Sequence, residues 1–336
     1  DSATKNIAAS ILESAIHARN PHGGYISSFN IDDYRNGRSL TSLPADLKQE
    51  LESKLQASSD PNQNTVLYIM HSLPDEIPMR KELIGIAQKH GKIGGLPECT
   101  LDVLKAAYHP NNNPAFSDEL FVFIKKESAI RVTDDSGTDF TVTMNHSKYP
   151  VMHSSGILKP KRFGNPIPSE VYLYPEDVNG TMVIKGSYGP IMGHERFRND
   201  YASLVDVLQK TPIIWQIRKG EITDVNCNDA EIQAYVRTAV FEKDPVNGNK
   251  FGEFGAPSNL YILSRELTGN MIIDEKGRVH GAHADGYKSN GSGCPYESKE
   301  HGDGLIANAT MFSMRLQEHI MVANKYNPSI FKTLSK

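Results

Sequence analysis

The sequence predicts an α+β protein with a small N-terminal α/β domain, residues 1–115, and a β-rich, barrel-like domain, residues 116–336. Helix-forming runs on either side of one short apolar run predict the first domain. Short runs rich in β-branched and aromatic residues, separated by turn residues, begin at about residue 119 and predict the second. The stretch HPNNNP at 109–114 is typical of a loop or linker between them.

The first domain is expected to contain helices and at least one strand. Residues 4–18 have spaced apolar positions and few helix breakers, which is typical of a helix. Residues 44–58 begin with proline and continue in strong helix formers, so a second helix is expected there. The apolar run 65–71 indicates a buried strand, and a further helix is expected over 79–90.

The second domain is expected to consist mainly of short strands. Their even spacing and the Gly, Asp, Asn and Pro residues between them indicate an antiparallel or barrel-like arrangement. One helix, at about 229–242, interrupts them. The expected strands are 119–125, 129–133, 138–144, 170–174, 181–185 and 212–218.

Composition and charge exclude several classes of protein. The chain has 336 residues, 36 Lys and Arg against 40 Asp and Glu, and a formal charge of −4, which is typical of a soluble globular protein. This balance argues against non-specific binding to nucleic acid. No apolar run approaches the ~20 residues that span a bilayer, so no membrane partner is expected. Cys99, Cys227 and Cys294 are widely spaced, which fits a reducing cytoplasm rather than a disulfide framework.

Residues 274–303 form the most concentrated polar cluster in the sequence. Their histidines, His280, His283 and His301, are interspersed with acids, and imidazole and carboxylate groups suit zinc, manganese, iron or cobalt. His301 and Asp303 form an HxD pair, and on a strand residues i and i+2 face the same side. From spacing alone, the alternative is a solvated acidic loop with surface histidines.

Motifs of several common enzyme classes are absent from the sequence. It contains no Gly-rich dinucleotide motif opening a helix, no Walker phosphate loop, no GxSxG elbow and no HExxH helix. Cys294 lacks a local catalytic signature and is interpreted as structural.

Several segments, taken in order, resemble the aminopeptidase T (thermophilic aminopeptidase) family of metallopeptidases. The resemblance covers about residues 94–326 and implies a C-terminal domain that binds two metals. The segments are GGLPECTLDVL (94–104), AIRVTDDSGTDFTVT (129–143), FGNPIPSEVYLYPEDVNGTMVIKGS (163–187), GEFGAPSN (252–259), DEKGRVHG (274–281) and HGD (301–303).

The same resemblance implies a set of metal ligands, with Glu253 able to bridge two ions, and an active-site tyrosine at Tyr287. The ions would be zinc, cobalt or manganese, and would activate a water to attack an amide carbonyl. Tyr287 would donate a hydrogen bond to the developing oxyanion, and its alternative role is packing. Two departures from the family pattern, Ser169 and Pro257 in place of glycine, bear on substrate choice. The implied ligands are Glu170, Glu253, Glu275, His280, His301 and Asp303.

The sequence therefore predicts a cytoplasmic, homodimeric metallo-aminopeptidase that releases N-terminal residues from a peptide or small amide. One alternative is a mononuclear non-haem Fe(II) dioxygenase that opens hydroxypyridine rings. By resemblance, the site of such enzymes has the HxD pair, a histidine at the position of Glu253 and no acid at the position of Glu170. Another is a diverged biosynthetic-pathway protein acting on a modified peptide. By resemblance, residues 310–324 are predicted to form two short strands, although their propensity also allows a helix.

Overall fold

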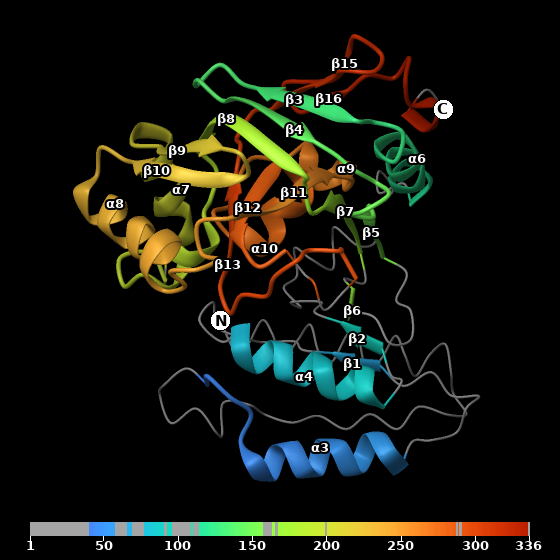
Figure 1. Ribbon diagram of the computed structural model, residues 1–336, viewed down its shortest axis with the longest axis vertical. Coiled ribbons are helices and arrows are strands. Elements are labelled where there is room, and N and C mark those ends of the chain that lie inside the picture. Colours follow the sequence, from blue (N-terminus) through green and yellow to red (C-terminus); the bar gives the residue numbers. More distant parts are fainter. Residues whose placement is uncertain are drawn as a thin grey trace. The chain divides into compact units, whose positions relative to one another are not determined.

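The computed structural model divides the chain into two compact units (Figure 1). Unit 1 comprises residues 1–109 and 157–167, and unit 2 comprises residues 110–156 and 168–336. The structure describes residues 40–57, 66–68, 77–90, 93–95, 109, 114–156, 163–164, 167–198, 200–286, 288 and 291–334.

Unit 1 contains two helices and a parallel three-stranded sheet among its described residues. Leucines of α3 (Ala45–Ala57) recur every fourth residue and pack with Met79, Leu83 and Ile86 of α4 (Ile77–Lys89). The ion pair of Lys48 Nζ with Glu82 Oε1, 2.7 Å long, also joins the two helices. The sheet has the order β1 (Val66–Tyr68), β2 (Ile93–Gly95) and β6 (Phe163–Gly164).

The structure bears out the elements expected in this unit wherever it describes them. Helices lie within or close to the expected ranges 44–58 and 79–90, and a strand lies within 65–71. The expected helix at 4–18 and most of the expected loop at 109–114 lie outside the described residues.

Unit 2 is built on two antiparallel sheets. The larger has eight strands, in the order β10-β9-β8-β4-β3-β14-β15-β16. Their bounds are β3 (Ala129–Thr133), β4 (Asp139–Thr143), β8 (Asp177–Ile184), β9 (Ile213–Arg218), β10 (Glu221–Asn226), β14 (Thr310–Ser313), β15 (Glu318–Val322) and β16 (Lys325–Tyr326).

The smaller sheet has five strands, in the order β13-β12-β11-β7-β5. β7 pairs with β11, which follows it in the chain only after β8, β9 and β10, so the sheet brings distant segments together. The strands are β5 (Met152–Ser155), β7 (Pro168–Leu173), β11 (Phe251–Pro257), β12 (His280–Ala284) and β13 (His301–Leu305).

Helices and helical turns connect and cover these sheets (Figure 1). α7 and α8 are each capped by an aspartate side chain, Asp200 and Asp229, that accepts hydrogen bonds from first-turn amides. The helical elements are α6 (Pro114–Ile124), η1 (Gly189–Gly193), α7 (Tyr201–Lys210), α8 (Ala230–Arg237), η2 (Thr238–Glu242), α9 (Leu260–Leu263), α10 (Met271–Asp274), η3 (Glu275–Gly277) and η5 (Lys332–Leu334).

The expected barrel is not found, because the described strands of unit 2 form two open sheets instead of one closed sheet. The two sheets share one hydrophobic core. Phe140 of β4 lies 6.2 Å from Phe251 of β11, measured between ring centroids, and Ile184 of β8 packs against Gly304 of β13. Short strands with turn signals are typical of both arrangements, so the sequence pattern did not separate them.

Residues 119–124 form part of helix α6 and residue 125 lies in the turn that follows it, so the strand expected over 119–125 is absent. Phe116, Leu120 and Ile124 recur every four residues and are buried, which is the pattern of a helix face. Pro114 occupies the start of the helix, where its missing N–H costs nothing. The β-branched and aromatic residues misled the prediction because burial against the sheet outweighs local propensity.

The other expected strands of unit 2 are present, with ends shifted by a few residues. The predicted pair of strands within 310–324 is confirmed as β14 and β15. The helix predicted at 229–242 is confirmed as α8, which continues into the π-helical turn η2. Among the helices that the structure describes, none has the length and apolar character needed to cross a bilayer.

Candidate metal centre

Five of the six candidate ligands lie on one face of the five-stranded sheet, and the sixth, Glu275, lies in η3. Strand pairing sets Asp303 opposite Ala282, and Ala282 opposite Glu253, so the two acids stand in one row across three strands. In the same way Gly255 pairs with His280, and Pro257 with Glu170. Alternation along each strand therefore turns these acids and histidines to a common side, with small residues between them.

A β-bulge precedes Glu253 on β11. The register between β11 and β12 shifts between Phe251 and Glu253, so Gly252 is the extra residue. A Cβ at Gly252 would lie 2.5 Å from the carbonyl oxygen of Ala284, which explains the need for glycine at this position. Bulges of this kind redirect the side chain that follows them.

Glu170, Glu253 and His280 form a compact, buried group. One ligand atom from each lies within 4.8 Å of the others. His280 Nε2 is 2.9 Å from Glu170 Oε2 and 3.5 Å from Glu253 Oε1. Ligand bonds of ~2.0–2.1 Å in a tetrahedral zinc site place neighbouring ligand atoms about 3.3 Å apart. The observed distances bracket that value, so the donor set fits a divalent metal ion.

Backbone carbonyls fix the ring orientation of the two histidines at the site. His280 Nδ1 donates to the carbonyl oxygen of Arg278 at 3.0 Å, and His301 Nδ1 donates to that of Asp285 at 2.8 Å. Both rings therefore present Nε2 to the acids. Histidines that bind metals commonly use their second nitrogen in this way.

The surroundings of the Glu253 carboxylate favour a bound cation. It is 4% exposed, and its Oε2 atom has no hydrogen-bond partner among the described residues. Burial raises its pKa to about 7, a hydrogen bond from His280 acts in the opposite direction, and the charge of Glu170 adds to the increase. A bound cation would relieve both the burial and the repulsion.

His301 and Asp303 of β13 form an ion pair beside this group, with Nε2 and Oδ1 3.2 Å apart. Burial lowers the pKa of His301, but the charge and hydrogen bond of Asp303, together with the charge of Glu253, outweigh it and raise that pKa to about 10. Burial likewise opposes ionisation of Asp303, yet the charge and hydrogen bond of His301, together with the charge of His280, hold its pKa at about 2. As expected from the HxD spacing, the two side chains face the same side of one strand.

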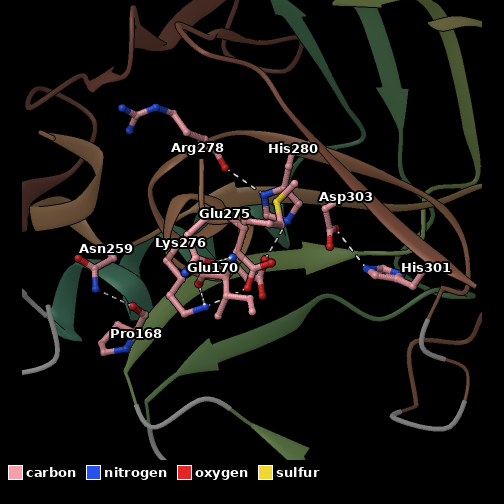
Figure 2. Close-up of polar contacts among 12 residues, drawn as sticks. Pro168, Glu170, Asn259, Glu275, Lys276, Arg278, His280, His301 and Asp303 are labelled. Atoms are coloured by element: carbon pink, nitrogen blue, oxygen red, sulfur yellow. Dashed lines mark hydrogen bonds and ion pairs between the residues drawn. The ribbon is translucent and has the colours of Figure 1, made fainter. Parts of the chain in front are cut away.

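Glu275 opens η3 and contacts a lysine that the sequence analysis did not single out. Lys276 Nζ lies 2.9 Å from Glu275 Oε1 and also donates to the carbonyl oxygen of Ile272. Lys276 is only 2% exposed. Burial raises the pKa of Glu275 and the lysine charge lowers it. Figure 2 shows Glu170, Glu275 and His280 pointing toward one another, with the pair of Asp303 and His301 beside them.

The remaining candidates of the polar cluster do not join this group. His283 is buried, its Nδ1 donates to the carbonyl oxygen of Gly248, and its Nε2 accepts from Tyr188. Burial lowers the pKa of His283 to about 4, so it is a neutral core residue. Cys294 is also buried, in keeping with a structural role. Tyr287 lies outside the described residues.

Sequence reasoning missed the buried polar residues that surround the ligands, notably Lys276, Arg278 and Asn259. Lys276 and Arg278 lie within the polar cluster, but a surface location is the ordinary expectation for both residue types. Asn259 belongs to a segment quoted for the resemblance, but no chemistry was assigned to it. The only available signal was their place beside the ligand positions.

A second polar group is packed between α6 and the sheet. Ser117 Oγ lies 2.8 Å from His153 Nε2 and donates to Ser258 Oγ at 2.9 Å, and His153 Nδ1 is 3.7 Å from Asp118. Such a row resembles a nucleophilic triad in composition. Ser117 has no exposed surface, however, so its hydroxyl stabilises packing and is closed to a substrate.

Comparisons with known proteins show a shared fold. No protein-family profile matches the sequence, and no curated protein sequence does. Among solved structures, 2,5-dihydroxypyridine dioxygenase from Pseudomonas putida KT2440 is similar with a TM-score of 0.54 and 15% identity, over 91% of this chain and 81% of that one. Wild-type AmpT from Thermus thermophilus is similar with a TM-score of 0.54 and 14% identity, over 85% of this chain and 81% of that one.

Proposed function

We propose that this protein is a metal-dependent hydrolase that releases N-terminal residues from peptides or small amides. The observation that carries the proposal is the buried group of Glu170, Glu253 and His280, which offers two carboxylates and one imidazole to a single point. The fold that this chain shares with AmpT, a metallo-aminopeptidase, also supports the proposal.

In this proposal Glu170, Glu253 and His280 would hold one divalent ion, and Glu253, His301 and Asp303 would hold a second. Such ions polarise a carbonyl group and lower the pKa of a bound water. The chain supplies the rest. Asp303 keeps the His301 ring in place, and the charge of Lys276 favours the ionised form of Glu275.

Replacing Glu253 tests the metal site and the activity together. Glu253→Ala should lose both bound metal and hydrolysis of aminoacyl amides, because it removes the central carboxylate. Metal content measured by mass spectrometry and amide hydrolysis give the two readouts. Glu266→Ala, at an exposed position, is the matched control and should retain both. A Glu253→Ala protein that keeps its metals would contradict the assignment.

Tyr287 is proposed as the oxyanion donor, and its hydroxyl can be tested separately. Tyr287→Phe should retain metal while turnover falls roughly 10²–10³-fold, the usual effect of removing one such donor. Full activity in Tyr287→Phe would instead assign the tyrosine to packing.

A ring-cleaving dioxygenase is the second candidate, because two histidines and one carboxylate also suit a non-haem Fe(II) site. His280, His301 and Asp303 supply that set, and the fold is shared with a dihydroxypyridine dioxygenase. The two buried acids beside His280 favour the hydrolase. Oxygen uptake by the Fe(II)-loaded protein with 2,5-dihydroxypyridine decides between them, since the hydrolase should consume none.

A further inference from the structure

Helix α9 connects the segments that carry three of the candidate ligands. It follows β11, which carries Glu253, and hydrogen bonds at its two ends join it to the segments that carry Glu170 and His280. Asn259 lies at its first end and Arg278 contacts its last turn. Both side chains are buried, and neither is itself a candidate ligand.

Asn259 joins these elements through hydrogen bonds of its side chain and its backbone. Its side-chain oxygen caps α9 by accepting from Ile262 N at 3.1 Å, and its Nδ2 donates to the carbonyl oxygen of Pro168 at 3.0 Å. Its backbone N–H donates to the carbonyl oxygen of Lys276 at 3.3 Å. Pro168 and Lys276 lie close in sequence to candidate ligands on β7 and η3, so one residue joins both segments, the first through its side chain and the second through its backbone.

Arg278 makes the corresponding connection at the other end of α9. Its guanidinium donates to the carbonyl oxygens of Leu263 at 3.2 Å and of Arg265. Its own carbonyl oxygen accepts the Nδ1–H of His280. The side chain therefore holds α9 while the backbone of the same residue orients the imidazole ring. Figure 2 shows the contact of the Arg278 carbonyl oxygen with His280 and the contact of Asn259 with Pro168.

We propose that Asn259 and Arg278 are positioning residues which, through α9, hold Glu170 and His280 at the separation that a metal ion requires. The inference rests on the proposed metal site. It adds that α9, Asn259 and Arg278, together called the α9 bracket, hold the ligands in place before the ion binds. A side chain that only stabilised the fold would not change the coordination geometry.

Co²⁺ binding is the test, because its visible spectrum reports the ligand geometry without any substrate. Asn259→Asp keeps an oxygen to cap Ile262 but loses the donor to Pro168. We expect at least a tenfold weaker Co²⁺ affinity and a shifted visible band. Asn270→Asp is the matched control: Asn270 caps α10 in the same way, but among the described residues its side-chain nitrogen donates no hydrogen bond. It should stay within twofold of the wild type.

Further variants keep the proposal testable if Asn259→Asp does not fold. Asn259→Ser can still cap α9 but is too short to reach Pro168, and Asn270→Ser is its control. Arg278→Lys retains the charge and loses the forked donor. If both act through one bracket, Asn259→Ser and Arg278→Lys together should weaken Co²⁺ binding less than the product of their separate effects.

The outcomes separate this inference from the proposed function. Equal affinities and spectra for the Asn259 and Asn270 variants, or effects that simply multiply, would overturn the bracket. A wild-type protein that binds Co²⁺, shows the variant effects and hydrolyses no amide would uphold the bracket and overturn the hydrolase. A wild-type protein that binds no Co²⁺ would overturn both.

Discussion

Gly255 lies directly against the imidazole of His280. A Cβ at this position would lie 2.1 Å from His280 Nε2, the atom that faces Glu170 and Glu253. A glycine is therefore needed here for space, and not for backbone conformation. The imidazole can present its nitrogen to the acids only because the neighbouring strand carries no side chain at this point.

We expect Gly255→Ala to displace the His280 ring and weaken Co²⁺ binding by about 10- to 100-fold, the range seen when a supporting residue of a metal site is changed. Overpacking should also destabilise the fold by about 1–3 kcal/mol. Gly189→Ala is the control, since a Cβ there would meet nothing closer than 3.7 Å. Wild-type Co²⁺ affinity in Gly255→Ala would show that the ring can move without loss.

The ion pair of His301 and Asp303 predicts how the metal-free protein responds to pH. The pKa of His301 in the folded state, about 10, lies above the ordinary value of about 6.5. The stability contributed by its proton is therefore complete below about pH 6.5 and is lost as the pH rises toward 10.

Thermal unfolding in the presence of a chelator checks this sign. The unfolding temperature of the wild type should fall more steeply between pH 6.5 and 10 than that of Asp303→Asn, in which the imidazole lacks its charged partner. Asp206→Asn, at an exposed position on α7, should follow the wild type. Equal slopes for the wild type and Asp303→Asn would rule out this linkage.

Among the elements, α6 allows a test of whether its residues form a helix or a strand. Leu120 is fully buried and Val122 is 51% exposed, as a helix requires. Leu120→Ala should lower the free energy of unfolding by about 2–5 kcal/mol. Val122→Ala should change it by less than about 0.5 kcal/mol. Denaturant unfolding measures both, and similar losses at the two positions would be incompatible with the helix.

Most elements could be predicted because local pattern and tertiary environment agree in them. β3 and β4 alternate between buried and more exposed residues, and turn residues bound both strands. α6 could not be predicted from propensity, since its Phe, Val and Ile residues favour strands and only contact with the sheet selects the helix. The same limit applies to the barrel, because sheet closure depends on pairing between distant strands.

For the molecule as a whole, residue type and spacing could nominate the ligands but not their surroundings. HxD spacing placed His301 and Asp303 on one side of a strand, and the resemblance nominated Glu170 and Glu253. The bulge at Gly252 and the buried contacts of Lys276 arise from strand pairing and close packing. Neither feature can be predicted from the periodicity of the sequence.

The order of strands in the smaller sheet has a consequence for folding kinetics. Glu170 and Asp303 are 133 residues apart in the chain, and their strands are separated by β11 and β12. Contacts over such sequence distances form late, after the costly closure of long loops. A metal ion should therefore find no complete site in the folding transition state. Stopped-flow measurements should show slower unfolding with metal and an unchanged refolding rate. Faster refolding with metal than without it would mean that the metal-binding strands already come together in the folding transition state.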